Sequence, residues 1–110
     1  MNSSAMAATV SPNVGGKDGL REFAVTVRQL SNANISLNVS QDVDTELQAY
    51  RELLLSLKLP GRRQNYAIAC IVHNRFELNG EFIYGCEYDW SSTMDPLGVA
   101  EDLLEYTLDA

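Results

Sequence analysis

Hydrophobic and polar residues alternate along two separate stretches of this chain, and each stretch predicts a β-hairpin. In the first, apolar side chains take every second position over residues 20–30, and the alternation resumes over residues 35–40 after a polar link. A hydrophobic period of two is typical of strands with one buried face. A loop of odd length would place Val27 opposite Ile35.

The second hairpin is predicted over Asn65–Trp90. This stretch contains both cysteines, the only histidine and the only tryptophan of the chain. Asn79 and Gly80 lie between its two apolar halves, and an Asn-Gly pair in this position is a strong signal for a tight turn.

The loop length of this second hairpin decides which side chains face the core. A three-residue loop pairs Phe76 with Phe82 and Val72 with Cys86, whereas a two-residue loop sets His73 beside Cys86. Apolar cross-strand pairs contribute about 0.2–1 kcal/mol each, so we favour the three-residue loop. On that register the even-numbered positions form the core face, which places these side chains beneath the helices: Phe76, Phe82, Cys86 and Trp90.

Two further segments have the hydrophobic period of a helix. The first is predicted over Asp42–Lys58, and Pro60-Gly61 follows it as a stop signal. The second is predicted to begin with Asp95 as its cap and Pro96 at the first helical position. Its inner stripe, which we expect to face the sheet, consists of Leu97, Ala100, Leu104 and Leu108, with Leu103 beside them.

These elements follow one another in the order ββαββα and predict an α+β domain. Two helices on one face of a four-stranded antiparallel sheet would form a two-layer sandwich that buries the apolar face of every strand. A cyclic permutation of the ferredoxin-like βαββαβ arrangement has the same order. We expect one domain over residues 20–110 and a flexible N-terminal arm over residues 1–19, with a short strand at Ala7–Val10 as an alternative.

The charge of the chain is acidic and unevenly distributed. The 110 residues carry a formal net charge of −7, which argues against direct binding of nucleic acid or of an anionic membrane. From Glu77 to Ala110 there are nine acidic residues and no Lys or Arg, and all eight basic residues precede this segment. No apolar run is long enough for a membrane span and the N-terminus lacks the pattern of a signal peptide, so we expect a cytoplasmic protein.

Residue types that catalyse reactions or bind metals form no recognisable pattern in this sequence. Two cysteines and one histidine are too few for a zinc site, which needs four ligands at short spacings. In a strand, Cys70 and His73 would point to opposite faces, so a Cys–His nucleophile pair requires the two-residue loop and Cys86. Glycine motifs that bind phosphate are missing as well. We therefore expect neither an enzyme nor a bound metal or cofactor, and we expect the thiols to be buried and free.

The acidic C-terminal third suggests a protein-binding antagonist that blocks a basic, nucleic-acid-binding surface of a target and so mimics nucleic acid. Small acidic α+β chains without motifs are common among bacterial immunity proteins, antitoxins and phage-encoded inhibitors, which is an analogy of composition only. Complementary charge would accelerate association with such a target. The candidate partner-binding residues are Glu87, Asp89, Glu101, Asp102, Glu105 and Asp109.

Two other functions are alternatives. One is a small-ligand-binding module with a pocket near Tyr84, Tyr88 and Trp90, with His73 as a further member. The other is a homodimeric, chaperone-like protein. Its interface would be the partly apolar outer face of the second hairpin, at Ala69, Ile71 and Ile83.

Overall fold

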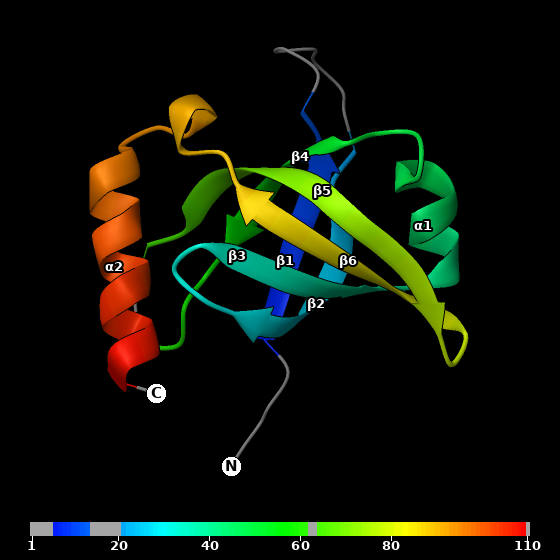
Figure 1. Ribbon diagram of the computed structural model, residues 1–110, viewed down its shortest axis with the longest axis horizontal. Helices are drawn as coiled ribbons and strands as arrows, with labels where there is room; N and C mark the ends of the chain where they lie inside the picture. Colours follow the sequence, from blue (N-terminus) through cyan, green and yellow to red (C-terminus); the bar gives the residue numbers. More distant parts are fainter. Residues whose placement is uncertain (1–5, 14–20, 62–63, 110) are drawn as a thin grey trace.

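The fold is a closed barrel of six antiparallel strands, with two α-helices at opposite sides of it (Figure 1). The computed structural model describes residues 6–13, 21–61 and 64–109. The elements are β1 (Met6–Pro12), β2 (Phe23–Leu30), β3 (Asn34–Val39), α1 (Gln41–Leu47), β4 (Glu52–Leu57), β5 (Tyr66–Leu78), β6 (Glu81–Tyr88), a short 3-10 helix η1 (Trp90–Ser92) and α2 (Pro96–Asp109). Around the barrel the strands follow the order β1-β2-β3-β6-β5-β4, and β1 also pairs with β4. Neither α-helix of the described residues has the length and apolar content needed to cross a membrane.

Alternation along the strands places one apolar row of each strand inside the barrel. Leu37 of β3 and Leu55 of β4 are fully buried there, and each such side chain stabilises the fold by about 1.5–3 kcal/mol. α1 begins after Ser40, whose hydroxyl accepts a hydrogen bond from a backbone N–H of the first turn. The buried Leu47 joins α1 to this core, and Leu103 joins α2 to it.

The predicted two-layer sandwich is wrong, because the segment interpreted as one long helix contains a strand. α1 covers its first part and β4 covers most of the remainder. Leucine favours helices, and the leucines of this segment fit a helical period as well as an alternating one. The alternation prevails: Leu53, Leu55 and Leu57 are buried, whereas Leu54 is 40% exposed. β4 supplies one of the two strands that the predicted four-stranded sheet lacked.

The other strand, β1, lies within the N-terminal segment predicted as an arm. It extends the alternative strand at Ala7–Val10 by one residue towards the N-terminus and by two towards the C-terminus. Val10 is buried between the two neighbouring strands, where it lies opposite Phe23 on one side and Leu55 on the other. The rest of the predicted arm, residues 1–5 and 14–19, lies outside the described residues.

The hairpin of β2 and β3 forms as predicted, but its register differs by two residues. Val27 lies opposite Leu37 instead of Ile35, and a β-bulge follows Val27. Ser31 organises the turn, because its hydroxyl accepts a hydrogen bond from the Asn34 backbone N–H at 3.0 Å. This local bond between a side chain and the backbone has no counterpart in the hydrophobic pattern.

The tip of the β5–β6 hairpin has the two-residue loop, so the predicted three-residue loop is wrong there. Asn79 and Gly80 have φ angles of 54° and 84°, which is typical of a type I′ turn and favours these two residue types. Phe76 consequently lies opposite Ile83 instead of Phe82. Its side chain is 52% exposed, so its predicted place in the core is wrong too, whereas Phe82 packs partly buried against the core.

A β-bulge at His73 restores the predicted register in the rest of this hairpin. Val72 lies opposite Cys86 and Asn74 lies opposite Gly85, so His73 is the additional residue. Because a bulge adds one residue to one strand, the alternation of the two faces of β5 is reversed beyond His73. From Cys86 to the end of β6 the register is as predicted, and Cys86 is buried as expected.

The bulge places Arg75 opposite the buried Tyr84 of β6, where the exposed Arg75 meets Asp44 of α1 at one end of the barrel. The Arg75 Nε donates a hydrogen bond to Asp44 Oδ1 at 2.6 Å, and its Nη2 donates to Oδ2. The Tyr84 hydroxyl donates to Asp44 Oδ1 at 2.6 Å. The Arg75 hydrogen bonds, assisted by Tyr84, hold the pKa of the buried Asp44 below its ordinary value despite the opposing effect of burial. This cluster ties α1 to the central hairpin.

Candidate functional site

The helix α2 packs on the barrel with a different face from the predicted one. Val99 and Leu103 are buried against the core. The predicted inner residues Leu97, Leu104 and Leu108 are 80%, 42% and 76% exposed, so the prediction of the inner stripe is wrong. Apolar residues surround much of this helix, and a hydrophobic period alone fits either face. Three leucines of α2 therefore face outward.

A hydrogen bond between Asp102 and the barrel accompanies the observed orientation. The Tyr66 hydroxyl donates to Asp102 Oδ2 at 2.8 Å, and the Gln64 side-chain amide donates to the same oxygen at 3.5 Å. Asp102 lies at the edge of the contact with the barrel, between the buried Leu103 and the exposed Glu101. Asp102 is one of the residues predicted to bind a partner, and in the structure its carboxylate joins α2 to β5.

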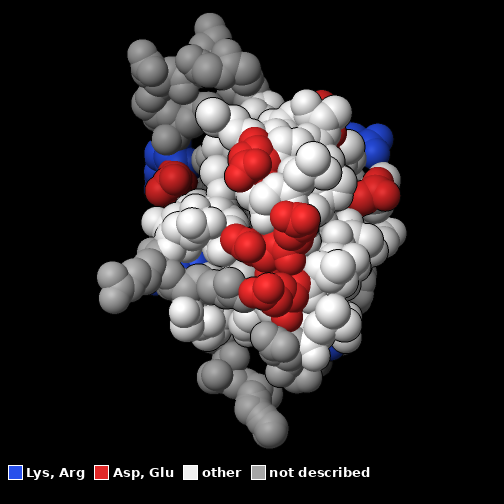
Figure 2. All heavy atoms as spheres, turned by 90° about the vertical axis from the view of Figure 1, so that its left-hand side faces the viewer, with Lys and Arg blue, Asp and Glu red and all other residues white. Residues whose placement is uncertain are grey.

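Glu101 and Glu105 lie one turn apart on the exposed side of α2. Figure 2 shows acidic side chains gathered along the centre of this side of the molecule, with no Lys or Arg among them in the part that the structure describes. A shallow groove of about 460 Å³ lies here, lined by Glu101, Asp102, Leu104, Glu105 and Leu108. We call the surface formed by Leu97, Glu101, Leu104, Glu105 and Leu108 the α2 face.

The remaining acidic candidates lie elsewhere or are only partly described. Glu87 is on β6, where its Oε1 lies 2.7 Å from His73 Nε2. Asp89 precedes η1, and hydrogen bonds from Ser91 and then Ser92 lower the pKa of its carboxyl. Asp109 belongs to the last turn of α2, and its side chain is outside the described part of the structure. The structure thus brings together Glu101, Asp102 and Glu105 on one helix.

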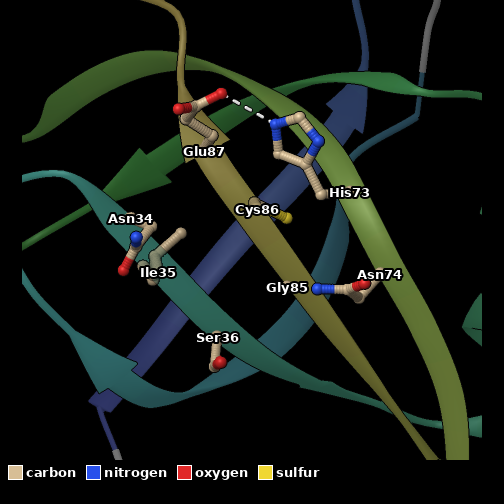
Figure 3. A pocket seen from close by; sticks show the side chains of 8 residues that line it. All are labelled: Asn34, Ile35, Ser36, His73, Asn74, Gly85, Cys86 and Glu87. Atoms are coloured by element: carbon tan, nitrogen blue, oxygen red, sulfur yellow. Dashed lines mark hydrogen bonds and ion pairs between the residues drawn. The ribbon is translucent and has the colours of Figure 1, made fainter.

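The bulge at His73 also creates a polar hollow of about 270 Å³ on the outer surface of the barrel, which we call the bulge pocket. In Figure 3 the His73 ring reaches towards Glu87, while the Asn74 amide lies over Gly85. Gly85 allows the Asn74 side chain to lie close to β6, because a Cβ there would be only 3.3 Å from Asn74 Nδ2. The polar residues around it that the sequence did not single out are Asn34, Ser36 and Asn74. Asn34 and Ser36 already fall on the polar face of the alternation in β3, whereas the outward position of Asn74 becomes recognisable only when the bulge in β5 is known.

Cys70 and Cys86 are buried free thiols, as predicted. Burial raises the pKa of Cys86 to about 12 and also raises the pKa of Cys70. His73 and Cys86 both line the bulge pocket, but the His73 ring is placed against the Glu87 carboxylate. A buried thiol that stays protonated is a poor nucleophile. Among the residues that the structure describes, no group of three or more His, Cys, Asp or Glu side chains could hold a metal ion.

The aromatic rings proposed for a ligand pocket belong mainly to the core. Tyr84 and Tyr88 are buried, and the Tyr88 hydroxyl donates to the Ser31 carbonyl oxygen at 2.9 Å. The partly buried Trp90 packs against Tyr88, with ring centroids 5.1 Å apart. Of the four residues in that hypothesis, only His73 lines the bulge pocket.

The outer face proposed for a homodimer is largely covered within the chain itself. Ala69 and Ile83 are buried, and Ile71 is half-buried. The segment after η1 covers Ala69, whose backbone N–H donates to the Thr93 hydroxyl at 3.1 Å. Two of the three side chains in that hypothesis are therefore not available to a partner in this structure.

Comparison with known proteins shows a similar fold in solved structures of an inhibitor and of an oxidoreductase. The first is the Bacillus subtilis inhibitor of motility (MotI/DgrA), with a TM-score of 0.73 and 16% sequence identity over 96% of this chain. The second is the Streptomyces globisporus NADH:FAD oxidoreductase SgcE6, with a TM-score of 0.56 and 13% identity over 76% of this chain.

At these identities the likeness concerns the fold alone. The chain spans 46% of the length of the inhibitor of motility and 72% of that of the oxidoreductase. No protein-family model matches the sequence, and no curated protein matches it. The chain therefore shares its fold with one protein named as an inhibitor and with another named as an oxidoreductase.

Proposed function

We propose that this protein is a non-catalytic, protein-binding antagonist that uses the α2 face to cover a basic surface of a target protein. The observation that carries the proposal is that exposed leucines and glutamates share one face of α2. Exposed apolar side chains that group together mark interaction sites. Carboxylates beside them favour a partner with positive charge and speed its association.

Charge and fold give further support. The last third of the chain carries nine acidic residues without a Lys or Arg, within a net charge of −7. Basic surfaces are typical of proteins that bind nucleic acid, so we propose a target of that kind and a role as a nucleic-acid mimic. One protein with a similar barrel is named as an inhibitor, of motility. Our proposal includes action in the cytoplasm, in a host–phage or toxin–immunity setting.

The proposal includes no catalysis and no resident cofactor. The two thiols are buried and their pKa values are raised, so neither is activated as a nucleophile. His73, the only histidine of the sequence, lies on the barrel surface with its ring against the Glu87 carboxylate.

The test compares the whole chain with two variants of equal charge. Glu101→Lys/Glu105→Lys reverses the α2 face, whereas Glu77→Lys/Glu81→Lys reverses two exposed acids at the β5–β6 tip, on the other side of the barrel (Figure 1). We expect the unmodified chain and the tip variant to capture basic proteins from a lysate at low salt and to release them at high salt. The α2-face variant should capture far less.

A captured protein should then lose its nucleic-acid binding when the unmodified chain is added. Equal capture by all three chains would contradict the proposal, because the acids of α2 would then have no particular role. Capture without any effect on nucleic-acid binding would contradict the choice of target.

The bulge pocket favours a second candidate function, binding of a small polar ligand. Asn34, Ser36 and Asn74 present hydrogen-bonding groups around a hollow that Gly85 also lines. Thermal-shift screening of nucleotides, flavins and metabolites tests this function. A ligand of the pocket should stabilise the unmodified chain and the Asn32→Ala control but not Ser36→Ala/Asn74→Ala, and no stabilisation across the panel would reject this candidate.

A further inference from the structure

We infer that the target segment is a basic amphipathic α-helix, which packs lengthwise on the α2 face so that the two helices form an intermolecular pair. This inference rests on the proposed function and specifies the element of the partner that α2 binds. It makes the leucines the main source of affinity and the glutamates the source of selectivity.

The exposed side of α2 carries one apolar row and one acidic row. At about 100° per residue, Leu97, Leu104 and Leu108 fall within an arc of roughly 40°. Glu101 and Glu105 form the adjacent row, and each precedes a leucine by three residues, which places the pair about 5–6 Å apart. The shallow groove at this surface is lined by residues of both rows.

The length and shape of the leucine row fit a helix as the occupant. From Leu97 to Leu108 the row extends over roughly 16 Å, about three turns. Amphipathic helices present apolar side chains at the same three- and four-residue spacings and pack on a neighbouring helix with axes about 8–10 Å apart. Leu97 and Leu108 are 80% and 76% exposed, so such a helix would remove substantial apolar surface from water.

Charge decides which helix or surface can cover this row. A second copy of the chain would bring its own glutamate row beside that of the first, and each copy carries a net charge of −7. An anionic membrane and nucleic acid are disfavoured by the same repulsion. A helix with Lys or Arg flanking its apolar row would instead place cations opposite Glu101 and Glu105.

The direct test uses a synthetic peptide of about 14 residues, roughly 21 Å long as a helix. Leucines form one row of this peptide and lysines form the adjacent row. A scrambled peptide of the same composition cannot align its leucines on one face and controls for charge alone. Binding to the whole chain is measured by fluorescence anisotropy, and the binding site is mapped by backbone amide shifts in nuclear magnetic resonance spectra.

We expect the amphipathic peptide to shift amides of α2 and to bind at least about tenfold more tightly than the scrambled peptide. Leu104→Ala/Leu108→Ala should weaken its binding about tenfold or more, with the melting temperature preserved because both side chains point outward. Leu78→Ala is the matched control, since Leu78 at the hairpin tip is 41% exposed and Leu104 is 42% exposed. Its binding should change less than about twofold.

A charge exchange tests the glutamate row. The Glu101→Lys/Glu105→Lys variant should no longer bind the lysine peptide. It should instead bind a matched peptide in which glutamates replace the lysines. Equal binding of the amphipathic and scrambled peptides, shifts centred away from α2, or an unchanged affinity of the leucine variant would each overturn the inference.

The leucine variant also separates this inference from the proposed function. If Leu104→Ala/Leu108→Ala still captures a target that Glu101→Lys/Glu105→Lys loses, the antagonist proposal holds and the helix inference fails. If both variants capture the target as well as the unmodified chain, both are rejected.

Discussion

Asp44, Arg75 and Tyr84 come from α1, β5 and β6, and they form one hydrogen-bonded cluster at an end of the barrel. In the sequence Asp44 resembles an ordinary acid in the first turn of a helix, and regular pairing would have left Arg75 on the outer face. Arg75 reaches the cluster only because the bulge at His73 reverses the faces of β5. At this scale the alternation of residue types identified most buried strand positions but could not locate a single-residue irregularity.

Replacing Asp44 by Asn should lower the free energy of unfolding by about 2 kcal/mol near neutral pH. This is less than the roughly 3–5 kcal/mol of a fully buried pair, because the Arg75 side chain is 35% exposed and solvent screens the interaction. Since the folded-state pKa of Asp44 is lowered, its contribution is present above the ordinary pKa of 3.8 and is lost as the pH falls through the folded-state value.

Urea unfolding at about pH 7 and about pH 2.5 measures this contribution. The difference between the unmodified chain and Asp44→Asn should shrink at the lower pH. Asp42→Asn removes an exposed carboxylate from the same helix and should have little effect at either pH. A difference that persists unchanged into acid would show that Asp44 does not act through its charge.

Cys70 and Cys86 should be inert in the folded protein. Both are buried, and burial raises the pKa of each thiol, so the reactive thiolate is scarce at mildly alkaline pH. Labelling with iodoacetamide should modify neither residue in the native chain and both in urea. A Ser92→Cys variant has its new thiol at an exposed position and should be labelled at that one site without urea. Rapid labelling of Cys86 in the native chain would contradict the expected inertness.

At the scale of elements, the strands with clean alternation were predicted and the leucine-rich segments were misassigned. β2, β3, β5 and β6 and the start of α2 at Pro96 agree with the sequence patterns. β4 was mistaken for helix because its leucines fit two periods. The inward face of α2 was mistaken because leucines lie on both sides of it, and a tyrosine–carboxylate bond to β5 accompanies the choice between them.

The observed orientation of α2 predicts a large loss of stability at one leucine of this helix and almost none at another. Leu103→Ala should lower the free energy of unfolding by about 2–5 kcal/mol, because it leaves a cavity where the side chain is fully buried. Leu108→Ala, a change of the same size at an exposed position, should change it by less than about 0.5 kcal/mol. Chemical denaturation of the two variants measures both effects, and the reverse ranking would place the originally predicted stripe against the barrel.

At the scale of the whole molecule, closure of the barrel depends on pairings that join distant parts of the chain. β1 pairs with β4, which is far along the sequence, and β3 pairs with β6. Local patterns identify strands but do not identify partners, so an open sheet and a closed barrel are compatible with the same hairpins. The weakly apolar β1 was the least recognisable strand, and without it the barrel would expose the edges of β2 and β4.

Two neighbouring alanines of β1 test this closure. Ala8 is buried opposite Val25 and Leu57, so Ala8→Asp places an unpaired carboxylate in the core and should destabilise the chain by about 3 kcal/mol or more. Ala7 is exposed, and Ala7→Asp should cost less than about 1 kcal/mol. Thermal unfolding followed by circular dichroism compares them, and equal melting temperatures would mean that β1 does not form a wall of the barrel.

The additional residue at His73 has a consequence for changes of chain length in β5. Deleting one residue between the bulge and the tip would exchange inside and outside over that whole part of the strand, which would expel Arg75 from Asp44 and drive Phe76 inward. Adding or removing two residues would keep Arg75 on the side of Asp44 and Phe76 on the outside. Natural or engineered length variation between the bulge and the tip is therefore expected to occur in steps of two residues, because a change of one residue exchanges the two faces of the strand.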